Sequence, residues 1–130
     1  MKTLTNRRTA MILAGLTVCM SLCTLGECAD DTMSVYIGTY TRKGSKGIYL
    51  SKLNMTAGTL SKPVLAAETD NPTFLAIHPS GRFIYAAGGA GKIDGKQTGL
   101  LTALSIDKTT GKLTQLNRQP SGGQGPCHIF

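Results

Sequence analysis

The sequence predicts an all-β fold that is built from repeats of a four-stranded antiparallel sheet. After residue 30, short β-rich runs alternate with turns that contain Gly, Pro, Asn and Ser. No stretch of this part shows a sustained apolar period of about 3.6 residues, so we expect almost no helix there. The sequence also repeats itself at a spacing of roughly 50 residues, which is typical of repeat architectures.

The β-rich runs place the expected strands. In chain order they are Val35–Tyr40, Gly47–Leu53, Leu60–Glu68, Thr73–Ile77, Phe83–Ala87, Leu100–Ile106 and Leu113–Gln119. The glycine-rich run 88–96 is expected to be a flexible loop, because Gly and the Asp94-Gly95 pair favour turns. This run is only superficially similar to a phosphate loop, since the GxxxxGK[ST] spacing is missing.

Self-comparison of the chain shows the repeat. Residues 54–60 align with residues 107–113. Each segment begins with Asn or Asp, has Gly four residues later and ends with Leu two residues after the Gly. An Asn or Asp side chain can bond to its own turn backbone and Gly takes positive φ, so both segments predict hairpin turns. The same comparison aligns Ile48–Leu53 with Leu101–Ile106, and Asn71-Pro72-Thr73-Phe74 with Gly125-Pro126-Cys127-His128.

A repeat of this length is close to that of kelch-type blades and long for a WD-type blade. A sheet with two apolar faces needs a neighbour on each, so we expect the units to stack as blades of a β-propeller. Residues 30–130 would then form a partial propeller. Blade 1 is expected at about 34–69, blade 2 at about 72–120 and the start of blade 3 at about 126–130, with Pro-containing crossings between the blades.

Residues 1–29 have the three parts of a secretory signal. Lys2, Arg7 and Arg8 form a basic n-region, an apolar stretch covers residues 10–25, and small residues precede Asp30. We expect a helical signal segment that is removed during export to the periplasm or the cell exterior. An uncleaved anchor is less favoured because the apolar stretch is short for a span of about 20 residues, so no stable membrane span is expected after processing.

The route and the cleavage position stay open. The Arg7-Arg8 pair fits a twin-arginine signal, but the usual bulky residue after the arginines is missing, which favours the Sec route. Cleavage after Cys28 fits the small residues there. A lipoprotein anchor at Cys28 is the alternative, although Glu27 stands where such an anchor needs a small residue.

Charge and composition exclude several classes of function. The chain has 130 residues and a formal net charge of +7. Its lysines are scattered rather than gathered in a basic helix or stripe, which is not typical of a nucleic-acid reader. A basic surface can still steer small anionic substrates. Two distant histidines without a carboxylate cluster give no metal site, and no cofactor is implied.

Cysteine usage indicates stability from packing. Cys19, Cys23 and Cys28 lie in the signal segment, which leaves Cys127 in the mature chain. A single cysteine cannot form an internal disulfide. A Cys127–His128 nucleophile is not favoured, because adjacent residues on a strand point to opposite faces.

Three groups of motifs occur in a fixed order along the chain. They are Tyr36–Thr41 with Gly47–Tyr49, then Asn71–Tyr85, then Gly111–Leu113 with Gln119–Gly123 and Gly125–His128. In this order they resemble the lactonase family of seven-bladed β-propellers, which includes 6-phosphogluconolactonases of the propeller type and carboxymuconate cyclases. The resemblance covers Ser34 to Phe130. It implies a protein of roughly 350 residues, so we expect this chain to be a truncated product that lacks about five blades.

The resemblance also implies chemistry on a lactone ring. The small-molecule partner would be a sugar-acid lactone that is hydrolysed, or a carboxymuconate-like acid that is cyclised. A propeller that binds a ligand or protein without catalysis stays the alternative, because fold alone does not fix function. By itself the truncated chain is expected to be inactive.

His128 is the catalytic residue that the resemblance implies. Its segment would contribute to the mouth of the active site, where an imidazole can act as general base or acid. The repeat places His128 at the position that Phe74 holds in the other unit. A structural histidine bonded to a neighbouring loop is the alternative. His78 is expected to shape the turn before Arg82, and Arg82 to be a solvated charge.

Overall fold

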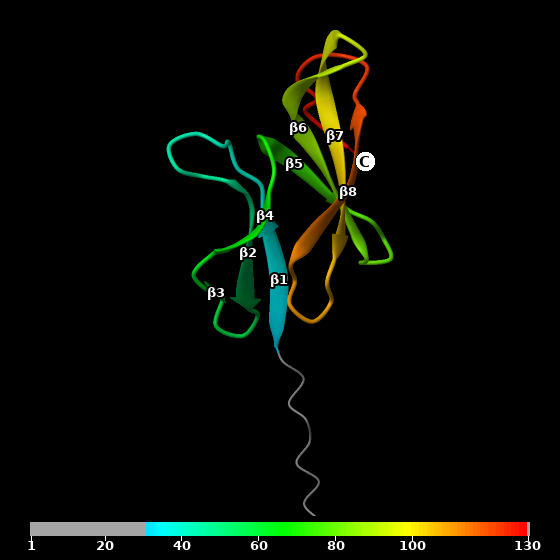
Figure 1. The fold of residues 1–130 in the computed structure, drawn as a ribbon. Helices are drawn as coiled ribbons and strands as arrows, with labels where there is room; N and C mark the ends of the chain where they lie inside the picture. Colours follow the sequence, from blue (N-terminus) through cyan, green and yellow to red (C-terminus); the bar gives the residue numbers. More distant parts are fainter. Residues whose placement is uncertain (1–30, 130) are drawn as a thin grey trace, which may run out of the picture.

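The computed structural model describes residues 31–129, and every regular element in this part is a β-strand (Figure 1). The first antiparallel sheet consists of β1 (Thr32–Ile37), β2 (Gly47–Asn54), β3 (Thr59–Leu60) and β4 (Val64–Glu68). The second consists of β5 (Pro72–Ile77), β6 (Phe83–Ile93), β7 (Lys96–Ile106) and β8 (Leu113–Pro120). The expected all-β architecture is confirmed for these residues, among which no helix could cross a membrane. The expected signal segment lies outside them.

The second sheet is a regular meander, because each strand pairs with the next one along the chain. The first sheet differs. β1 pairs along one edge of β2, whereas β3 pairs with Leu53 and Asn54 and β4 pairs with residues 47–50. Since a strand has only two edges, β3 and β4 share the second edge of β2. The first sheet is therefore three strands across, and the single strand expected over Leu60–Glu68 is interrupted.

The interruption at residues 61–63 has a local cause. Pro63 has no backbone N–H and cannot donate to a strand ladder. The Ser61 hydroxyl accepts a hydrogen bond from the backbone N–H of Lys52 at 2.9 Å, and the Ser51 hydroxyl donates to the Ser61 carbonyl at 2.7 Å. The Ser61 N–H also donates to the Lys52 carbonyl at 2.9 Å. Bonds of the Ser61 backbone and side chain therefore hold the chain beside β2 where the strand is interrupted.

Strand pairing repeats from the first sheet to the second sheet. The corresponding pairs are Tyr36 with Leu50 and Tyr85 with Ala103, and Leu53 with Leu60 and Ile106 with Leu113. β1, β2 and the β3–β4 pair are thus equivalent to β6, β7 and β8. In the described part of the chain, the first sheet has no strand equivalent to β5.

The two hairpin turns of the repeat also match. Asn54 Oδ1 and Asp107 Oδ1 each accept a hydrogen bond from the N–H three residues later, at 2.6 and 2.8 Å. Gly58 and Gly111 have φ values of 66° and 71°, in the left-handed region that Gly enters without a steric penalty. The predicted turn is therefore confirmed in both units.

The glycine-rich run 88–96 corrects an expectation. It forms no flexible loop: β6 continues to Ile93, β7 begins at Lys96, and Asp94-Gly95 make the turn of a long hairpin. A register shift between Gly88 and Ala90 lets the pairing continue past the first glycines. Glycine favours turns but can also pair as a bulged strand, which the composition of the run did not distinguish.

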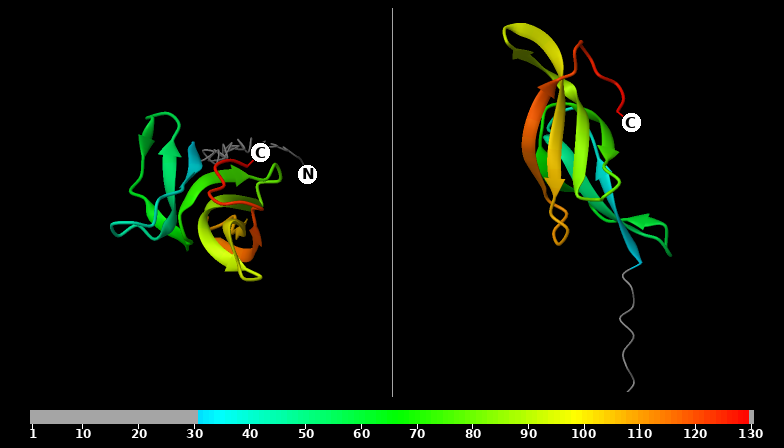
Figure 2. Two further views of the ribbon diagram at one scale, coloured as in Figure 1. Left: turned by 90° about the horizontal axis from the view of Figure 1, so that it is seen from above. Right: turned by 90° about the vertical axis from the view of Figure 1, so that its right-hand side faces the viewer.

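The two sheets lie side by side and bury their core between them (Figure 2). The buried cluster contains Ile48, Leu50, Ala66, Ile84, Ala86, Leu104 and Leu113. Ile48, Ile84 and Leu104 have no exposed surface, so β2, β6 and β7 each contribute a fully buried side chain. Burial of aliphatic side chains of this kind contributes about 1.5–3 kcal/mol each.

The chain passes between the sheets through a short link at residues 69–71, where β1 and β5 come very close. Gly38 follows β1, and a Cβ at this position would collide with the carbonyl oxygen of Pro72 and lie 3.3 Å from Leu75 Cγ. Only glycine fits such an approach without moving a backbone. The close approach of β1 and β5 therefore requires glycine at position 38.

A substitution of Gly38 tests this contact. Gly38→Ala is expected to lower the free energy of unfolding by about 1–3 kcal/mol, because overpacking forces the backbone apart. Urea unfolding followed by circular dichroism measures the change. Gly123→Ala, at a position where a Cβ meets nothing within 4 Å and φ is not positive, is the matched control. Equal midpoints for both variants would contradict the proposed role.

Candidate functional site

The sheets have two chemically different ends. We call the end with the β1–β2 loop, the link 69–71 and the segment 121–126 the crossing end, and the opposite end, with the β2–β3, β5–β6 and β7–β8 turns, the hairpin end. In Figure 1 the β7–β8 turn lies at the bottom of the second sheet and the β6–β7 hairpin at its top. Each end has a cavity.

The segment after β8 carries His128 back across the second sheet. Gly99 N–H donates to the Gly123 carbonyl at 2.6 Å, and Ser121 N–H donates to the Gly99 carbonyl at 2.9 Å. A Cβ on Gly99 would collide with the ring of Pro126. The segment is therefore fixed where it crosses the start of β7. Residues 126–129 form no strand in this structure.

This crossing brings His128 onto the first strand of the sheet. The rings of His128 and Phe74 have centroids 4.4 Å apart at an angle of 50°. The next residue, Ile129, lines a cavity of about 340 Å³ together with Ala76 and Tyr85. Phe74, Ala76 and Tyr85 lie on the face of the second sheet that is opposite to the face with the buried side chains of Ile84 and Ala86. The segment therefore covers the face of the second sheet that points away from the first sheet.

His128 thus contacts the residue to which the repeat aligns it. Its side chain is exposed, and the aromatic contact fixes one face of the ring against β5. Cys127 has different surroundings: its Sγ lies 3.2 Å from the Gly125 carbonyl of its own turn, and it lines the crossing-end cavity. The adjacent side chains therefore face different parts of the molecule, as expected for neighbours on an extended chain.

The crossing-end pocket has a volume of about 290 Å³. It is formed by the β1–β2 loop, the link, the start of the β6–β7 hairpin and the final segment. Its lining residues are Tyr40, Arg42, Asn71, Thr73, Gly88, Gly89, Ala90, Gly125, Pro126 and Cys127. Arg42 carries the only formal charge among them. Arg42 could not be identified as a site residue from the sequence, because no local motif marks a loop arginine as part of a pocket.

Hydrogen bonds tie the loop before Arg42 to the link. Thr41 N–H donates to Asn71 Oδ1 at 3.1 Å, and the Thr41 hydroxyl donates to Asp70 Oδ1 at 2.9 Å. Asn71 has a φ of 42°, and its carbonyl lies so close to Gly88 that a Cβ there would collide with it. Two segments about 30 residues apart in sequence are thus held together beside the pocket.

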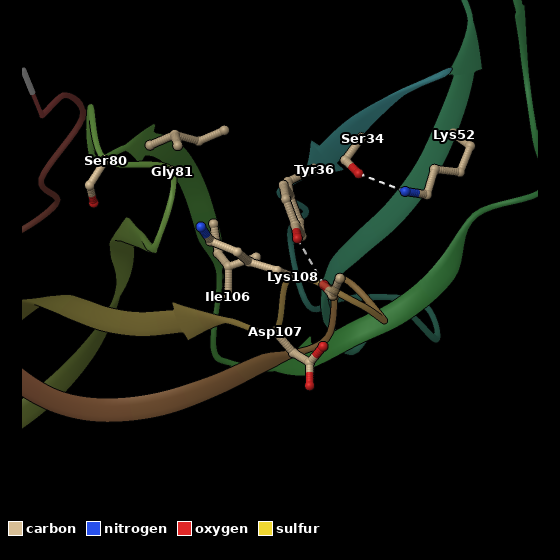
Figure 3. A pocket seen from close by; sticks show the side chains of 10 residues that line it. Ser34, Tyr36, Lys52, Ser80, Gly81, Ile106, Asp107 and Lys108 are labelled. Carbon is tan, nitrogen blue, oxygen red and sulfur yellow. Dashed lines mark hydrogen bonds between the residues drawn. The ribbon is translucent and has the colours of Figure 1, made fainter. Parts of the chain in front are cut away.

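The cavity at the hairpin end is larger, about 440 Å³, and lies between the two sheets (Figure 3). Its polar groups bond to each other. Lys52 Nζ donates to Ser34 Oγ at 2.9 Å, and Tyr36 OH donates to the Gly111 carbonyl at 2.8 Å. Asp107 accepts hydrogen bonds from the N–H groups of the turn that follows it. The Tyr36 bond joins the two sheets, whereas the Lys52 bond lies within the first sheet and the Asp107 bonds lie within the β7–β8 turn. Together they indicate a structural seam.

Two groups in this seam have shifted pKa values. Burial raises the pKa of Tyr36 above its ordinary value of 10.0, and the negative charge of Asp107 adds to the effect. The pKa of Asp107 is lowered by hydrogen bonds from the backbone N–H groups of Thr110 and Thr109. The shift of Tyr36 follows from the contact between β1 and the β7–β8 turn, whereas the shift of Asp107 arises within that turn.

The remaining candidates have the structural roles that the sequence predicted. His78 Nδ1 lies 2.8 Å from Ser80 Oγ, and Gly81 N–H donates to the His78 carbonyl at 2.8 Å, so His78 shapes its turn. Arg82 is exposed, with its guanidinium 5.5 Å from the centre of the Phe83 ring. Within residues 31–129, no group of three or more His, Cys, Asp or Glu side chains could hold a metal ion.

Two repeated antiparallel sheets that are joined by a short crossing and packed on each other are consistent with neighbouring blades of a β-propeller. The family model "Lactonase, 7-bladed beta-propeller" matches residues 34–130. The chain therefore belongs to the lactonase family of seven-bladed β-propellers.

The chain is similar in sequence to proteins that are named 6-phosphogluconolactonases. The chain is 43% identical over 94 residues to a 6-phosphogluconolactonase of Bacillus subtilis (strain 168), which covers 72% of this chain and 26% of the relative. A 6-phosphogluconolactonase of Formosa agariphila is 32% identical over 101 residues, which covers 73% of this chain and 26% of that protein. The chain thus spans about a quarter of the length of these relatives.

The chain is also similar to solved structures of proteins that are named lactonases. A candidate 6-phosphogluconolactonase from Bacteroides uniformis has a TM-score of 0.65 and 37% identity, covering 75% of this chain and 27% of that chain. The periplasmic gluconolactonase of Pseudomonas aeruginosa has a TM-score of 0.57 and 29% identity, covering 67% of this chain and 24% of that chain.

The hydrogen bond of Tyr36 predicts a specific pH dependence. Because the folded pKa of Tyr36 is raised, its contribution to stability is complete below the unfolded pKa of 10.0 and is lost as pH rises through the folded pKa. Tyr36→Phe is expected to cost about 1 kcal/mol at neutral pH, because the Gly111 carbonyl loses its donor. Urea midpoints between neutral and strongly alkaline pH check this. The difference in urea midpoint between the native protein and Tyr36→Phe should become smaller at strongly alkaline pH. A difference that does not change with pH would contradict the link between stability and the ionisation of Tyr36.

Proposed function

We propose that this chain supplies the first blades of a lactonase that hydrolyses a sugar-acid lactone, with His128 as its general base or acid. Membership of the lactonase family and the names of the relatives support this function. Blade 1 would cover about 34–69, blade 2 about 72–120, and a third blade would start at about 126. The repeated strand pairing supports these units.

The observation that carries the proposal is the position of the His128 imidazole. It is exposed, and its ring contacts the ring of Phe74 on β5. In hydrolysis, such an imidazole would take a proton from water as the oxygen attacks the lactone carbonyl. The bond from that carbon to the ring oxygen then breaks, and the proton passes to the leaving oxygen.

Hydrolysis is favoured over ring closure. The relatives described above are named as lactonases, and these names give no support to a cyclase. The substrate would be a small-molecule lactone, and positive groups would be needed to hold any anionic part of it. Both reactions can be assayed on the same protein, so the choice is open to direct measurement.

Replacement of His128 tests the function in a chimera in which residues 34–130 replace the matching segment of the Bacillus subtilis relative. The chimera is expected to hydrolyse δ-gluconolactone or its 6-phosphate. His128→Ala is expected to lower kcat by roughly 100-fold or more, as loss of a general base does. Turnover followed by acid release measures the change, and the 130-residue chain by itself is expected to be inactive.

His78→Ala is the matched control, because it removes the other histidine of the chain without touching the final segment. It is expected to keep nearly full turnover and to lower only thermal stability. Unchanged turnover of His128→Ala would end the catalytic assignment. If the well-folded chimera turns over no lactone but retains a lactone or another ligand, the non-catalytic binding propeller is correct.

We also propose that residues 1–29 direct export to the periplasm or the cell exterior by the Sec route. The basic start, apolar stretch and small residues of this segment support export. A similar solved structure is named as a periplasmic gluconolactonase. The mature protein would then begin after the small residues near Cys28.

The pair Arg7-Arg8 separates the two export routes. A fusion of residues 1–33 to a reporter enzyme is expected to reach the periplasm equally well when both arginines are changed to lysine, because a Sec signal needs only positive charge there. Cell fractionation and reporter activity measure this. Loss of export in the double lysine variant alone would show the twin-arginine route instead.

A further inference from the structure

We propose that Arg42 is the residue that binds an anionic group, such as a phosphate, on the lactone. This inference rests on the proposed function and assigns substrate selection to the crossing-end pocket. The pocket lies beside the segment that carries His128, since Cys127 lines it. Thr73 and Cys127 line the pocket, and the residues that follow them, Phe74 and His128, form the ring contact beside it. A substrate would therefore have to extend past Cys127 from the pocket to reach the imidazole.

Charge is the first reason for the assignment. Arg42 is the only charged residue that lines the pocket, and no carboxylate among residues 31–129 forms an ion pair with it. The nearby carboxylate of Asp70 does not line the pocket. Its Oδ1 accepts hydrogen bonds from the Thr41 hydroxyl at 2.9 Å and from Asn71 Nδ2 at 2.8 Å. The pocket therefore presents a positive charge that an anionic ligand can pair with.

Hydrogen-bond geometry is the second reason. A guanidinium has five N–H donors in a planar fork that matches the oxygens of phosphate or carboxylate. Thr73 and Asn71 also line the pocket, but the Thr73 hydroxyl donates to the Ala87 carbonyl at 3.4 Å and the Asn71 amide bonds to Thr41 and Asp70, so the guanidinium is the main donor to a ligand. A volume of about 290 Å³ lies near the lower end of the range for small-molecule sites, which suits a ligand of sugar-phosphate size.

Anchoring of the loop is the third reason. Arg42 directly follows Thr41, whose N–H and hydroxyl both bond to the link at residues 70–71. The Thr41 hydroxyl also accepts from Asn71 N–H at 3.3 Å. The backbone that carries the guanidinium is thus held at the pocket, which lowers the entropy cost of ordering the loop on binding.

Kinetics with a charged and an uncharged lactone test the inference in the chimera. Arg42→Ala is expected to raise KM for 6-phosphogluconolactone by roughly tenfold or more, the loss that removal of a charge-assisted hydrogen bond gives. KM for δ-gluconolactone should stay within about twofold, since that lactone has no phosphate to lose. Arg42→Lys should restore part of the difference, because a point charge replaces the fork.

Lys46→Gln is the matched control. It removes one positive charge from the same loop, but Lys46 lies 3.6 Å from Glu68 at the surface and does not line the pocket. It is expected to leave both KM values unchanged. If Arg42→Ala affects both lactones equally, or neither, the inference is wrong even though the chimera is a lactonase.

Binding to the 130-residue chain gives a second, independent measurement. NMR titration with 6-phosphogluconate is expected to shift the Nε–Hε signal of Arg42, while gluconate at the same concentration shifts it much less. An unchanged Arg42 signal with 6-phosphogluconate would overturn the inference. A chimera that hydrolyses neither lactone would overturn the proposed function instead, and the binding result would still decide the role of Arg42.

Discussion

The contact between the β7–β8 turn and the first sheet is the constraint on which the rest of the structure depends. Gly111 lies so close to Leu50 that a Cβ would collide with the leucine side chain, and its φ of 71° also requires glycine. This close approach lets Tyr36 bond to the Gly111 carbonyl and brings Ile84 and Leu104 onto the face of β2. The close packing of the two sheets therefore depends on a glycine at position 111 of the β7–β8 turn.

The repeat made most of the fold predictable from the sequence. Turns that begin with Asn54 and Asp107 form the same hydrogen bonds, so a short motif fixed both the turn and the register of the strands beside it. Two features were not predictable. The break before Val64 depends on bonds between Ser61 and β2, and the glycine-rich run from Gly88 forms a bulged hairpin because its partner strand continues. Both depend on neighbours rather than on local composition.

The candidate site was predictable only in part. His128 could be found because the repeat aligns it with Phe74, and the two rings meet in the structure. Its catalytic role comes from the family resemblance and stays a proposal. Arg42 gave no signal, because the pocket that it lines is completed by Asn71 and by residues near Gly125. Contacts between segments about 30 and 80 residues apart cannot be inferred from a motif within one loop.

The two ends of the sheets differ in a way that explains why we propose ligand binding at the crossing-end pocket and not at the larger cavity of the hairpin end. At the hairpin end, the Tyr36 hydroxyl of the first sheet donates to the Gly111 carbonyl of the second, so a ligand that took this donor would have to break a contact that joins the sheets. At the crossing end, Asp70 accepts hydrogen bonds from Thr41 and Asn71, and Arg42 is the only charged residue among those that line the pocket. A ligand there gains an interaction without the loss of a structural one, which is the condition for binding that does not destabilise the fold.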